Sequence, residues 1–366
     1  MKSNIRTFLF CFIFVIYCGT MGYSQRISIK GNNFVVNDKP IFLVGANTPW
    51  DSWNDFGGNY NPQFWEDEFS RMQKVGINSS RIWISCDNMG QPHIDMLGVV
   101  QKPSTEFWAH MDDMMQKAEK YGIYIMATVT SFDHFDEEKA NYQQWRSMLH
   151  CSQQIQAYID VFLLPLIARY ESNPYFFSVD ICNEPEWIHE HKKQGAIDWP
   201  QLQLFAGMCA AAVHRTQSSV LVSIGSAAVK WGSNKYEGNK WSDQALQVIT
   251  GDSLAYMDYW HIHYYEWINK HFSNPFTMSP SDYMLNDRPC VIGETPGLNT
   301  IYGFPITYEE IYEKPYELGY AGVYPWTSNG AGKGDFGNLN TFGVGATAFV
   351  TKYSELIPKQ TSNLKK

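Results

Sequence analysis

The sequence lacks an apolar run long enough to cross a membrane as a helix. Its most apolar stretch, from Thr7 to Tyr17, is well short of the about 20 residues that a spanning helix needs. Lys2 and Arg6 precede this stretch, and small residues up to position 24 follow it, which is the pattern of a signal peptide. We therefore expect residues 1–24 to be removed on export, leaving a secreted or periplasmic protein without a membrane span. Cys18 does not favour a lipoprotein anchor, because the bulky residues at 15–17 replace the small ones usual there.

Positive charge is also scarce. The chain carries 28 Lys and Arg against 37 Asp and Glu, a formal net charge of −9. Nucleic acids and anionic lipid surfaces attract basic proteins, so this balance argues against either as a partner. A neutral ligand fits the charge better. Nothing in the sequence indicates an oligomeric state.

Cysteine is too sparse and too irregular for a disulfide framework. Two of the seven Cys lie in the presumed signal peptide, and the other five are Cys86, Cys151, Cys182, Cys209 and Cys290. Most of these five stand inside apolar runs, and an odd number without close pairing is typical of small core residues. One disulfide remains open.

Several catalytic motifs are missing. No glycine-rich phosphate loop follows an early strand. The segment from Ser223 to Ser226 is not a Gly-x-Ser-x-Gly elbow, and residues 189–191 lack zinc-protease spacing. His261 and His263 could share a metal on one strand, but no carboxylate or Cys stands at suitable spacing beside them. We expect neither a metal nor a cofactor.

What the sequence does contain is a regular alternation of apolar strands and amphipathic helices. After a small hairpin over residues 27–36, eight strands are expected at 41–46, 77–85, 123–130, 176–182, 220–224, 259–264, 290–293 and 322–326. Helices are expected between them, at about 62–75, 105–121, 142–170, 200–215, 242–249 and 308–318, with a last one beginning near 345. Strands without strict alternation suit a parallel sheet covered on both faces. The fold class is therefore α/β, a (β/α)8 TIM barrel with a short N-terminal β-hairpin, and residues 25–366 form one domain. A doubly wound sheet is the second choice.

Two carboxylates stand out, because function in such a barrel lies at the carboxyl ends of the strands. Glu184 follows the fourth strand and Glu294 follows the seventh. Two carboxyls in one cavity cannot both ionise cheaply, so the pKa of one rises. This arrangement predicts a protonated acid/base, Glu184, and an ionised nucleophile, Glu294, the pair that glycoside hydrolysis needs.

Other strand-end residues would support this pair. Arg81 lies inside the second strand, where an unpaired charge is costly, so we expect it to bind Glu294. Asn183 can donate a hydrogen bond to a sugar hydroxyl. His263 and Tyr265 share one strand face, and the phenol can orient Glu294.

Aromatic side chains are abundant, at 16% of the residues, and flat rings stack on sugar faces. Trp326 ends the eighth strand and Trp50 follows the first, so both are candidate platforms for a sugar. Further aromatic residues at strand ends or in the following loops are Trp53, Phe56, Trp83, Phe132, Phe135, Trp187, Tyr264 and Trp267.

Together these segments resemble glycoside hydrolase family 5 of clan A, the cellulase and β-mannanase family. The matching positions are Arg81, the Cys-Asn-Glu-Pro run at 182–185, His-Tyr-Tyr at 263–265, Ile-Gly-Glu at 292–294 and Trp326, and the opening segment at 34–47 is also typical. Many members carry a His directly after the third strand. Here the segment is Thr130-Ser-Phe-Asp-His134, so His134 is the candidate for that position.

The resemblance implies a retaining β-glycoside hydrolase that acts on β-linked gluco- or manno-configured poly- or oligosaccharides, with β-mannan preferred. Long loops after the first and third strands could wall off the cleft, so exo action stays open beside endo action. Transglycosylation by the same covalent intermediate also stays open. The alternative outside catalysis is a carbohydrate-binding barrel, against which the intact carboxylate pair argues.

Overall fold

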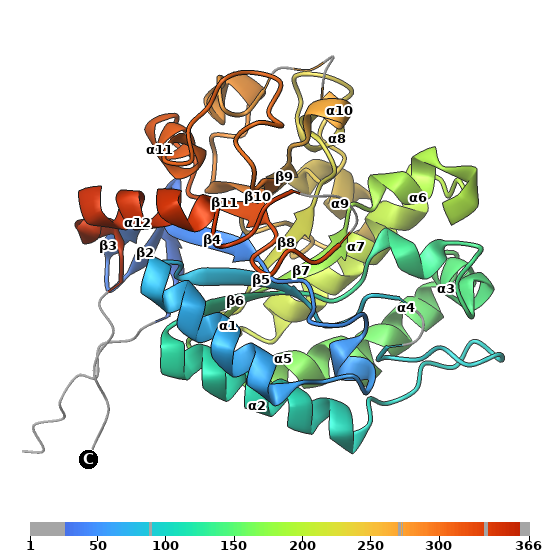
Figure 1. Cartoon of the computed structure of the whole chain (residues 1–366). Coiled ribbons are helices and arrows are strands. Elements are labelled where there is room, and N and C mark those ends of the chain that lie inside the picture. Colours follow the sequence, from blue (N-terminus) through green and yellow to red (C-terminus); the bar gives the residue numbers. More distant parts are fainter. Residues whose placement is uncertain (1–25, 88–89, 270–271, 273, 333–335, 359–366) are drawn as a thin grey trace, which may run out of the picture.

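The computed structural model describes residues 26–358 except 88–89, 270–271, 273 and 333–335. The expected signal peptide lies outside the described residues. Eight parallel strands follow one another around a barrel in chain order, and helices surround them (Figure 1). They are β4 (Leu43–Asn47), β5 (Ser79–Trp83), β6 (Tyr124–Thr128), β7 (Phe176–Asn183), β8 (Leu221–Gly225), β9 (Trp260–His263), β10 (Cys290–Pro296) and β11 (Gly322–Trp326). The expected barrel is confirmed.

The barrel closes between β8 and β9, where the strands make a short bridge instead of a full ladder. The backbone N–H of Ser226 donates to the carbonyl of His261 at 3.0 Å, and the N–H of His263 donates to the carbonyl of Ser226 at 2.8 Å. The N–H of Asp258 also reaches the carbonyl of Val222 at 2.9 Å. This seam brings the end of β9 directly beside the turn that follows β8.

The N-terminal hairpin is larger than expected. A third antiparallel strand, β3 (Lys39–Ile41), joins β1 (Ser28–Lys30) and β2 (Asn33–Val36). Asn37 and Asp38, with φ of 52° and 60°, form the two-residue turn that a right-twisted hairpin favours. Phe34 of this sheet packs edge-on against Phe177 and Tyr259 at ring distances of 6.3 and 5.2 Å. The small sheet therefore covers the amino-terminal end of the barrel.

Most helices lie where the sequence predicts them, on the outside of the barrel (Figure 1). The larger ones are α1 (Pro62–Val75), α2 (Thr105–Tyr121), α7 (Trp199–Arg215), α9 (Asp243–Thr250), α11 (Glu310–Glu317) and α12 (Phe342–Lys352). Helices α1 and α2 end at Gly76 and Gly122, both in the left-handed conformation that glycine adopts readily. Shorter helices follow several strands, namely α6 (Glu186–Glu190), α8 (Val229–Gly232) and α10 (Glu266–Asn269).

The long helical stretch expected over 142–170 is present, but it consists of several helices. The segment divides into α3 (Tyr142–Leu149), α4 (Ser152–Tyr158), a π-helical turn (Ile159–Leu163) and α5 (Leu164–Tyr170). Cys151, with an extended backbone at φ −133°, interrupts the first helix. Pro165 has no N–H to donate, and it lies two residues beyond the wider π turn.

The core is continuous from the barrel interior to the helices, and every residue of β4, β5, β6, β7 and β9 is buried. Four of the five described cysteines are buried and Cys151 is partly exposed. All five are free thiols. No described helix is long and apolar enough to cross a membrane.

Candidate active site

Glu184 and Glu294 come together at the carboxyl end of the barrel. One carboxylate oxygen of each lies within 4.8 Å of the other, and the residues are only 8% and 5% exposed. The pairing of β10 with β9 shifts between Ile292 and Glu294, and such an irregularity re-aims a side chain. Glu184 has φ 47°, an unusual conformation for a residue other than glycine, and strain of this kind gathers at functional sites.

Glu294 receives a hydrogen bond on each carboxylate oxygen. Nη1 of Arg81 donates to Oε1 at 2.7 Å, and the phenol of Tyr265 donates to Oε2 at 3.0 Å. Both donors are buried. Charge-assisted bonds in a low-dielectric site favour the ionised carboxylate, so the surroundings of Glu294 suit an anion.

Arg81 is itself fixed on all sides. Its Nε and Nη2 donate to Oδ2 of Asp180 at 2.9 and 2.7 Å. Nη2 also donates to Oδ1 of Asn183 at 2.9 Å, and Nη1 to Oδ1 of Asn47 at 3.2 Å. The guanidinium is 1% exposed, and two buried carboxylates, Asp180 and Glu294, balance its charge. The expected approach of Arg81 to Glu294 is present, and Asp180 is a partner that the sequence analysis did not name.

Glu184 has a different environment. Nδ1 of His263 lies 2.9 Å from Oε1, and the indole Nε1 of Trp187 donates to Oε2 at 2.7 Å. The indole of Trp187 stacks on His191 with ring centroids 4.8 Å apart and meets Trp231 edge-on at 5.4 Å. No arginine or lysine forms an ion pair with Glu184 among the residues that the structure describes.

These surroundings act on the pKa of each carboxyl. Burial raises the pKa of Glu184 to about 7, against the lowering effect of the Trp187 N–H and of Arg81. Burial also raises the pKa of Glu294, and there the positive charge of Arg81 opposes the rise. Burial lowers the pKa of His263 to about 4, so that imidazole is neutral at neutral pH. The site can therefore hold one protonated and one ionised carboxyl near neutrality.

Tryptophans line one side of this pair. Trp50 stacks on Trp83 at 5.0 Å and meets Trp53 and Trp326 edge-on at 4.6 and 6.1 Å. Trp83 and Trp326 are themselves 4.8 Å apart, and the same apolar cluster contains Tyr265. The expected platforms Trp50 and Trp326 thus belong to one aromatic wall, which extends to Tyr265, the residue whose phenol is hydrogen-bonded to Glu294.

His134 lies apart from the hydrogen bonds described for the two carboxylates. It is fully buried in the short turn after β6, its Nε2 is 2.8 Å from Oγ of Ser85, and its ring packs on Trp145 at 4.4 Å. Nδ1 of His134 lies 3.1 Å from the backbone of Ser131. These contacts fix the loop after β6, and a role of His134 toward substrate stays a prediction.

Glu186 is a buried residue of this region that the sequence analysis did not name. Its Oε1 accepts from Oγ of Ser226 and Nε1 of Trp241, each at 2.7 Å, and its Oε2 accepts from the N–H of Ala227 at 2.9 Å. Glu186 therefore ties the turn that carries Glu184 to the seam between β8 and β9. The sequence offered one signal for Glu186, its position two residues after Glu184. It could not show that Glu186 is buried, because the exposure of a residue after a strand end depends on how the following turn folds.

Glu184, His263 and Glu294 offer ligand atoms that all lie within 4.8 Å of one another, the spacing of a metal site. The electrostatics favour another use. Arg81 already neutralises Glu294, and His263 is bonded to Glu184. A cation at this point would face the guanidinium, so the cluster suits proton transfer between its own groups better than ion binding.

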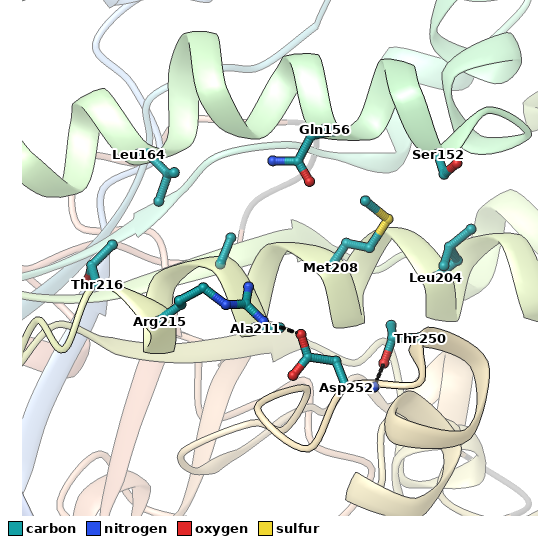
Figure 2. Close-up of a pocket in the computed structure, with 11 residues that line it drawn as sticks. Ser152, Gln156, Leu164, Leu204, Met208, Ala211, Arg215, Thr216, Thr250 and Asp252 are labelled. Carbon is teal, nitrogen blue, oxygen red and sulfur yellow. Dashed lines mark hydrogen bonds and ion pairs between the residues drawn. The ribbon is translucent and has the colours of Figure 1, made fainter.

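A separate pocket lies on the outer face of the molecule (Figure 2). It measures about 520 Å3 and lies between α4, α5 and α7, with apolar walls that include Leu164, Leu204 and Met208. The Arg215–Asp252 ion pair stands at one side of it. This pocket contains no pair of buried carboxyls, so the candidate chemistry stays at the barrel mouth.

No family model matches the chain. A curated relative named mannan endo-1,4-beta-mannosidase from Mytilus edulis is 26% identical over 340 residues, covering 86% of this chain and 90% of that protein. A protein of the same name from Cryptopygus antarcticus is 22% identical over 352 residues, and the match covers 88% of this chain and 90% of that protein.

Solved structures agree with these relatives. The β-mannanase from the blue mussel Mytilus edulis superposes with a TM-score of 0.77 at 25% identity, covering 88% of this chain and 96% of that one. The β-1,4-mannanase from the sea hare Aplysia kurodai superposes with a TM-score of 0.79 at 24% identity, and the match covers 92% of this chain and 100% of that one. Each of these four comparisons covers at least 86% of this chain.

Proposed function

We propose that this chain, a β-mannanase-like member of glycoside hydrolase family 5, cleaves internal β-1,4-linkages of mannan with retention of anomeric configuration. The observation that carries the proposal is the buried pair Glu184 and Glu294, with oxygens within 4.8 Å and only Glu294 paired with Arg81. Retaining enzymes keep their two carboxyls about 5 Å apart, whereas inverting enzymes leave a wider gap for water.

In the first half of the reaction, the ionised Glu294 attacks the anomeric carbon while Glu184 protonates the departing glycosidic oxygen. Arg81 and Tyr265 hold Glu294 by both oxygens, which fixes its direction of attack. Burial raises the pKa of Glu184 to about 7, so about half of the molecules carry this proton at pH 7 and most carry it at lower pH. A covalent glycosyl-enzyme results.

In the second half, Glu184 acts as a base. The leaving sugar has taken its proton, so Glu184 is now ionised and removes a proton from the water that attacks the anomeric carbon. The bond to Glu294 breaks, and both carboxyls return to their starting states. The hydrogen bond from the indole N–H of Trp187 to Glu184 stabilises the ionised form that this half requires.

Substrate contacts follow from the fixed side chains. Arg81 donates to Oδ1 of Asn183, so the amide nitrogen of Asn183 points away from the guanidinium and is oriented to donate to a sugar hydroxyl. The wall formed by Trp50, Trp83 and Trp326 offers apolar faces. Equatorially linked sugars have flat faces that stack on such rings.

Endo action on mannan is favoured over the other sugars and modes because the relatives carry the name mannan endo-1,4-beta-mannosidase. Export follows from residues 1–24, whose charged start and short apolar run have the pattern of a signal peptide. N-terminal sequencing of the protein recovered from outside the producing cell tests the cleavage point after residue 24.

The decisive experiment incubates the mature protein with mannan, a soluble cellulose derivative, xylan and defined manno-oligosaccharides. Early release of mixed oligosaccharides from mannan supports endo action, and early release of single sugars or disaccharides alone contradicts it. Proton NMR of the first products should show the β anomer. Initial α anomer would contradict retention, and binding of mannan without cleavage would favour the carbohydrate-binding alternative.

A further inference from the structure

Glu186 is a buried carboxyl that the proposed reaction does not use. Its side chain is 0% exposed, and it takes part in none of the ion pairs found among the described residues. It accepts hydrogen bonds from three neutral donors instead, the hydroxyl of Ser226 and the indole of Trp241 on Oε1 and the backbone N–H of Ala227 on Oε2. Burying a carboxyl without a counter-charge costs free energy, so its place here needs a specific reason.

The position of Glu186 in the fold suggests that reason. Glu184, with φ 47°, donates its backbone N–H to the carbonyl of Gly225 at 2.8 Å. Two residues later, Glu186 begins α6 and bonds to Ser226 and Ala227. The turn after β7 therefore rests on the turn after β8 at two points, one made by the backbone and one by the side chain of Glu186.

This turn–turn contact is linked to both side chains that have a described hydrogen bond to the Glu184 carboxyl. Trp187, whose indole donates to Oε2 at 2.7 Å, directly follows Glu186 in α6. His263, whose Nδ1 lies 2.9 Å from Oε1, donates its backbone N–H to the carbonyl of Ser226 at 2.8 Å. Glu186 thus couples the helix that carries one of these side chains to the strand that carries the other.

The turn–turn contact requires an acceptor on each arm of the Glu186 side chain. The indole N–H of Trp241 meets Oε1 at 2.7 Å, and the backbone N–H of Ala227 meets Oε2 at 2.9 Å. Both groups are donors only. Ser226 is adaptable, because its single hydroxyl hydrogen can point to Oε1 at 2.7 Å or to the carbonyl of Ala228 at 3.2 Å.

This adaptability preserves the turn–turn contact in both protonation states of Glu186. Burial raises the pKa of Glu186 to about 7, against the lowering effect of its three donors, so both states occur near neutral pH. The ionised carboxyl accepts from Ser226. The protonated carboxyl can donate its O–H to Oγ of Ser226, whose own hydrogen then turns to Ala228. A carboxyl has an oxygen on each arm in both states, whereas an amide has only one oxygen.

We propose that Glu186 is a positioning residue for the reaction, whose two carboxyl oxygens fix the turn of Glu184 on the turn after β8. Its effect reaches the reacting atoms through Trp187 and His263, since it has no described hydrogen bond to Glu184 or Glu294. The inference rests on the proposed role of Glu184 as acid/base. It assigns the effect of Glu186 to the step in which the leaving oxygen receives its proton.

Substitutions at Glu186 and Trp241 separate the parts of this proposal. Glu186→Gln retains the size of the side chain, but its NH2 group has to face the N–H of either Trp241 or Ala227, so one pair of donors meets without an acceptor. Trp241→Phe removes one of these two donors. In the double variant, the amide oxygen can accept from Ala227 while its NH2 group donates to Ser226, and the turn–turn contact is restored.

Asp258→Asn is the matched control. Oδ2 of Asp258 accepts from the backbone N–H of Val222 at 2.7 Å and lies 3.0 Å from Nε2 of His214. Asp258 precedes β9 and Val222 lies near the start of β8, so this carboxyl supports the same seam at the opposite end of the barrel. Its substitution should lower stability without a selective effect on protonation of the leaving group.

The first measurement compares two aryl glycosides of one manno-oligosaccharide. Dinitrophenolate leaves without a proton whereas phenolate needs one, so only the phenyl glycoside depends on a well-placed acid. Glu186→Gln should lower kcat/KM for the phenyl glycoside about 10-fold more than for the dinitrophenyl glycoside. The double variant should recover most of this difference, and Asp258→Asn should show none. A smaller folded fraction lowers both activities equally, so equal losses in Glu186→Gln would overturn the proposal.

Ser226→Ala is the milder variant and decides the question if Glu186→Gln does not fold. It removes one donor to Oε1 and leaves the Trp241 indole and the Ala227 N–H in place. The loss should again be selective for the phenyl glycoside, at about threefold. In that case, equal losses on the two glycosides in Ser226→Ala contradict the role of Glu186.

The second measurement is NMR of the indole N–H groups, which needs no turnover. Loss of one signal in Trp187→Phe identifies the group that is bonded to Glu184. Its exchange with solvent should be about 10-fold faster in Glu186→Gln than in the wild type. The double variant and Asp258→Asn should exchange at nearly the wild-type rate. An unchanged rate in Glu186→Gln would mean that Trp187 holds its place without Glu186, against the proposal.

The two measurements also distinguish this inference from the proposed function. If the wild type cleaves none of the polysaccharides, the proposed function fails, and the signal of Trp187 still tests whether Glu186 positions it. If the wild type cleaves mannan but Glu186→Gln retains the wild-type ratio of the two aryl activities and the wild-type exchange rate, the inference alone fails.

Discussion

In the barrel interior, Arg81 donates two hydrogen bonds to a single carboxylate oxygen of Asp180. Its Nε and Nη2 lie 2.9 and 2.7 Å from Oδ2. Asp180 also accepts from the hydroxyl of Thr128 at 3.0 Å and from the N–H of Gly225 at 2.8 Å. This carboxylate is fully buried and accepts four hydrogen bonds, three of them on Oδ2. Asp180 therefore anchors the guanidinium whose other end holds Glu294.

Asp180→Asn tests this anchor. The substitution retains the size of the side chain but removes one of two counter-charges from a buried guanidinium, so we expect a loss of about 3–5 kcal/mol in the free energy of unfolding. Turnover should fall as well, because Arg81 can then shift relative to Glu294. Urea unfolding and steady-state kinetics measure the two effects.

Asp112→Asn is the matched control for that substitution. Asp112 pairs with Arg169 on the outer helices, where the two side chains are 35% and 42% exposed. A surface pair of this kind contributes about 0–1 kcal/mol. A similar stability loss in both variants would mean that the Arg81–Asp180 pair has no special structural role.

The roles of the two carboxylates predict different rescue products. Glu184→Ala removes the proposed acid/base and should lower kcat on mannan by about 10²–10⁴-fold. With an activated aryl β-mannoside, azide can enter the glycosyl-enzyme and should give the β-mannosyl azide. Glu294→Ala removes the nucleophile, and azide attacking directly in its place should give the α-mannosyl azide. Exchanged products would reverse the assignment, and NMR of the azides decides it.

Trp187 should set the upper pH limit of activity. Its indole N–H donates to Oε2 of Glu184 and lowers the pKa of that carboxyl. Trp187→Phe removes the donor, so the pKa of Glu184 rises above about 7 and the alkaline limb of kcat/KM moves to higher pH. Trp231→Phe is the control, because Trp231 packs on Trp187 and its own Nε1 has no hydrogen-bond partner among the described residues. An unchanged limb in Trp187→Phe would contradict the role.

Glu184 should also make stability depend on pH. Its pKa is raised from 4.5 to about 7 by burial, so the protonated form is the stable one in the folded state. The stabilisation is complete below about pH 4.5, and it is lost as the pH rises through about 7. Relative to the wild type, Glu184→Gln should therefore gain about 2–3 kcal/mol between pH 4.5 and pH 8. Unfolding curves of both proteins at each pH measure this difference, and parallel curves would contradict it.

Much of the fold could be predicted from the sequence because local signals agreed with tertiary structure. Helices α1 and α2 have glycine at the C-cap and a polar residue at the N-cap, and their boundaries are as expected. The third strand of the N-terminal sheet was missed although Asn37-Asp38 is a hairpin turn signal. The break at Cys151 had no local signal, since neither glycine nor proline stands there.

The site residues also fall into two groups, those that local sequence predicts and those that it does not. Arg81 was found because a charge inside an apolar strand demands a partner, and the same reasoning applied to Asp180 in the fourth strand would have found the second half of the pair. Trp187 and Glu186 follow the strand end, and their contacts depend on how the turn folds back over β8. The sequence places His261 and His263 on one strand, but the contact of His261 with Ser223 on β8 joins two strands, and local sequence does not encode it.

Trp267 offers the sharpest test of sugar binding outside the reacting centre. Its side chain is 61% exposed, an unusual state for tryptophan, and its ring lies roughly parallel to Tyr265 with centroids 6.2 Å apart. Tyr265 contacts Glu294, so Trp267 lies one ring outward from the proposed nucleophile, where a further sugar of the polymer would lie.

Trp267→Ala should raise KM for long manno-oligosaccharides about 10-fold, since an exposed stacking contact contributes roughly 1–1.5 kcal/mol, and should leave kcat nearly unchanged. The same substitution should have little effect on an aryl mannoside, which is too short to reach the ring. Trp108→Ala, on the outer helix α2, is the control for the loss of a partly exposed tryptophan. Equal effects of Trp267→Ala on short and long substrates would place the function of this ring in packing on Tyr265.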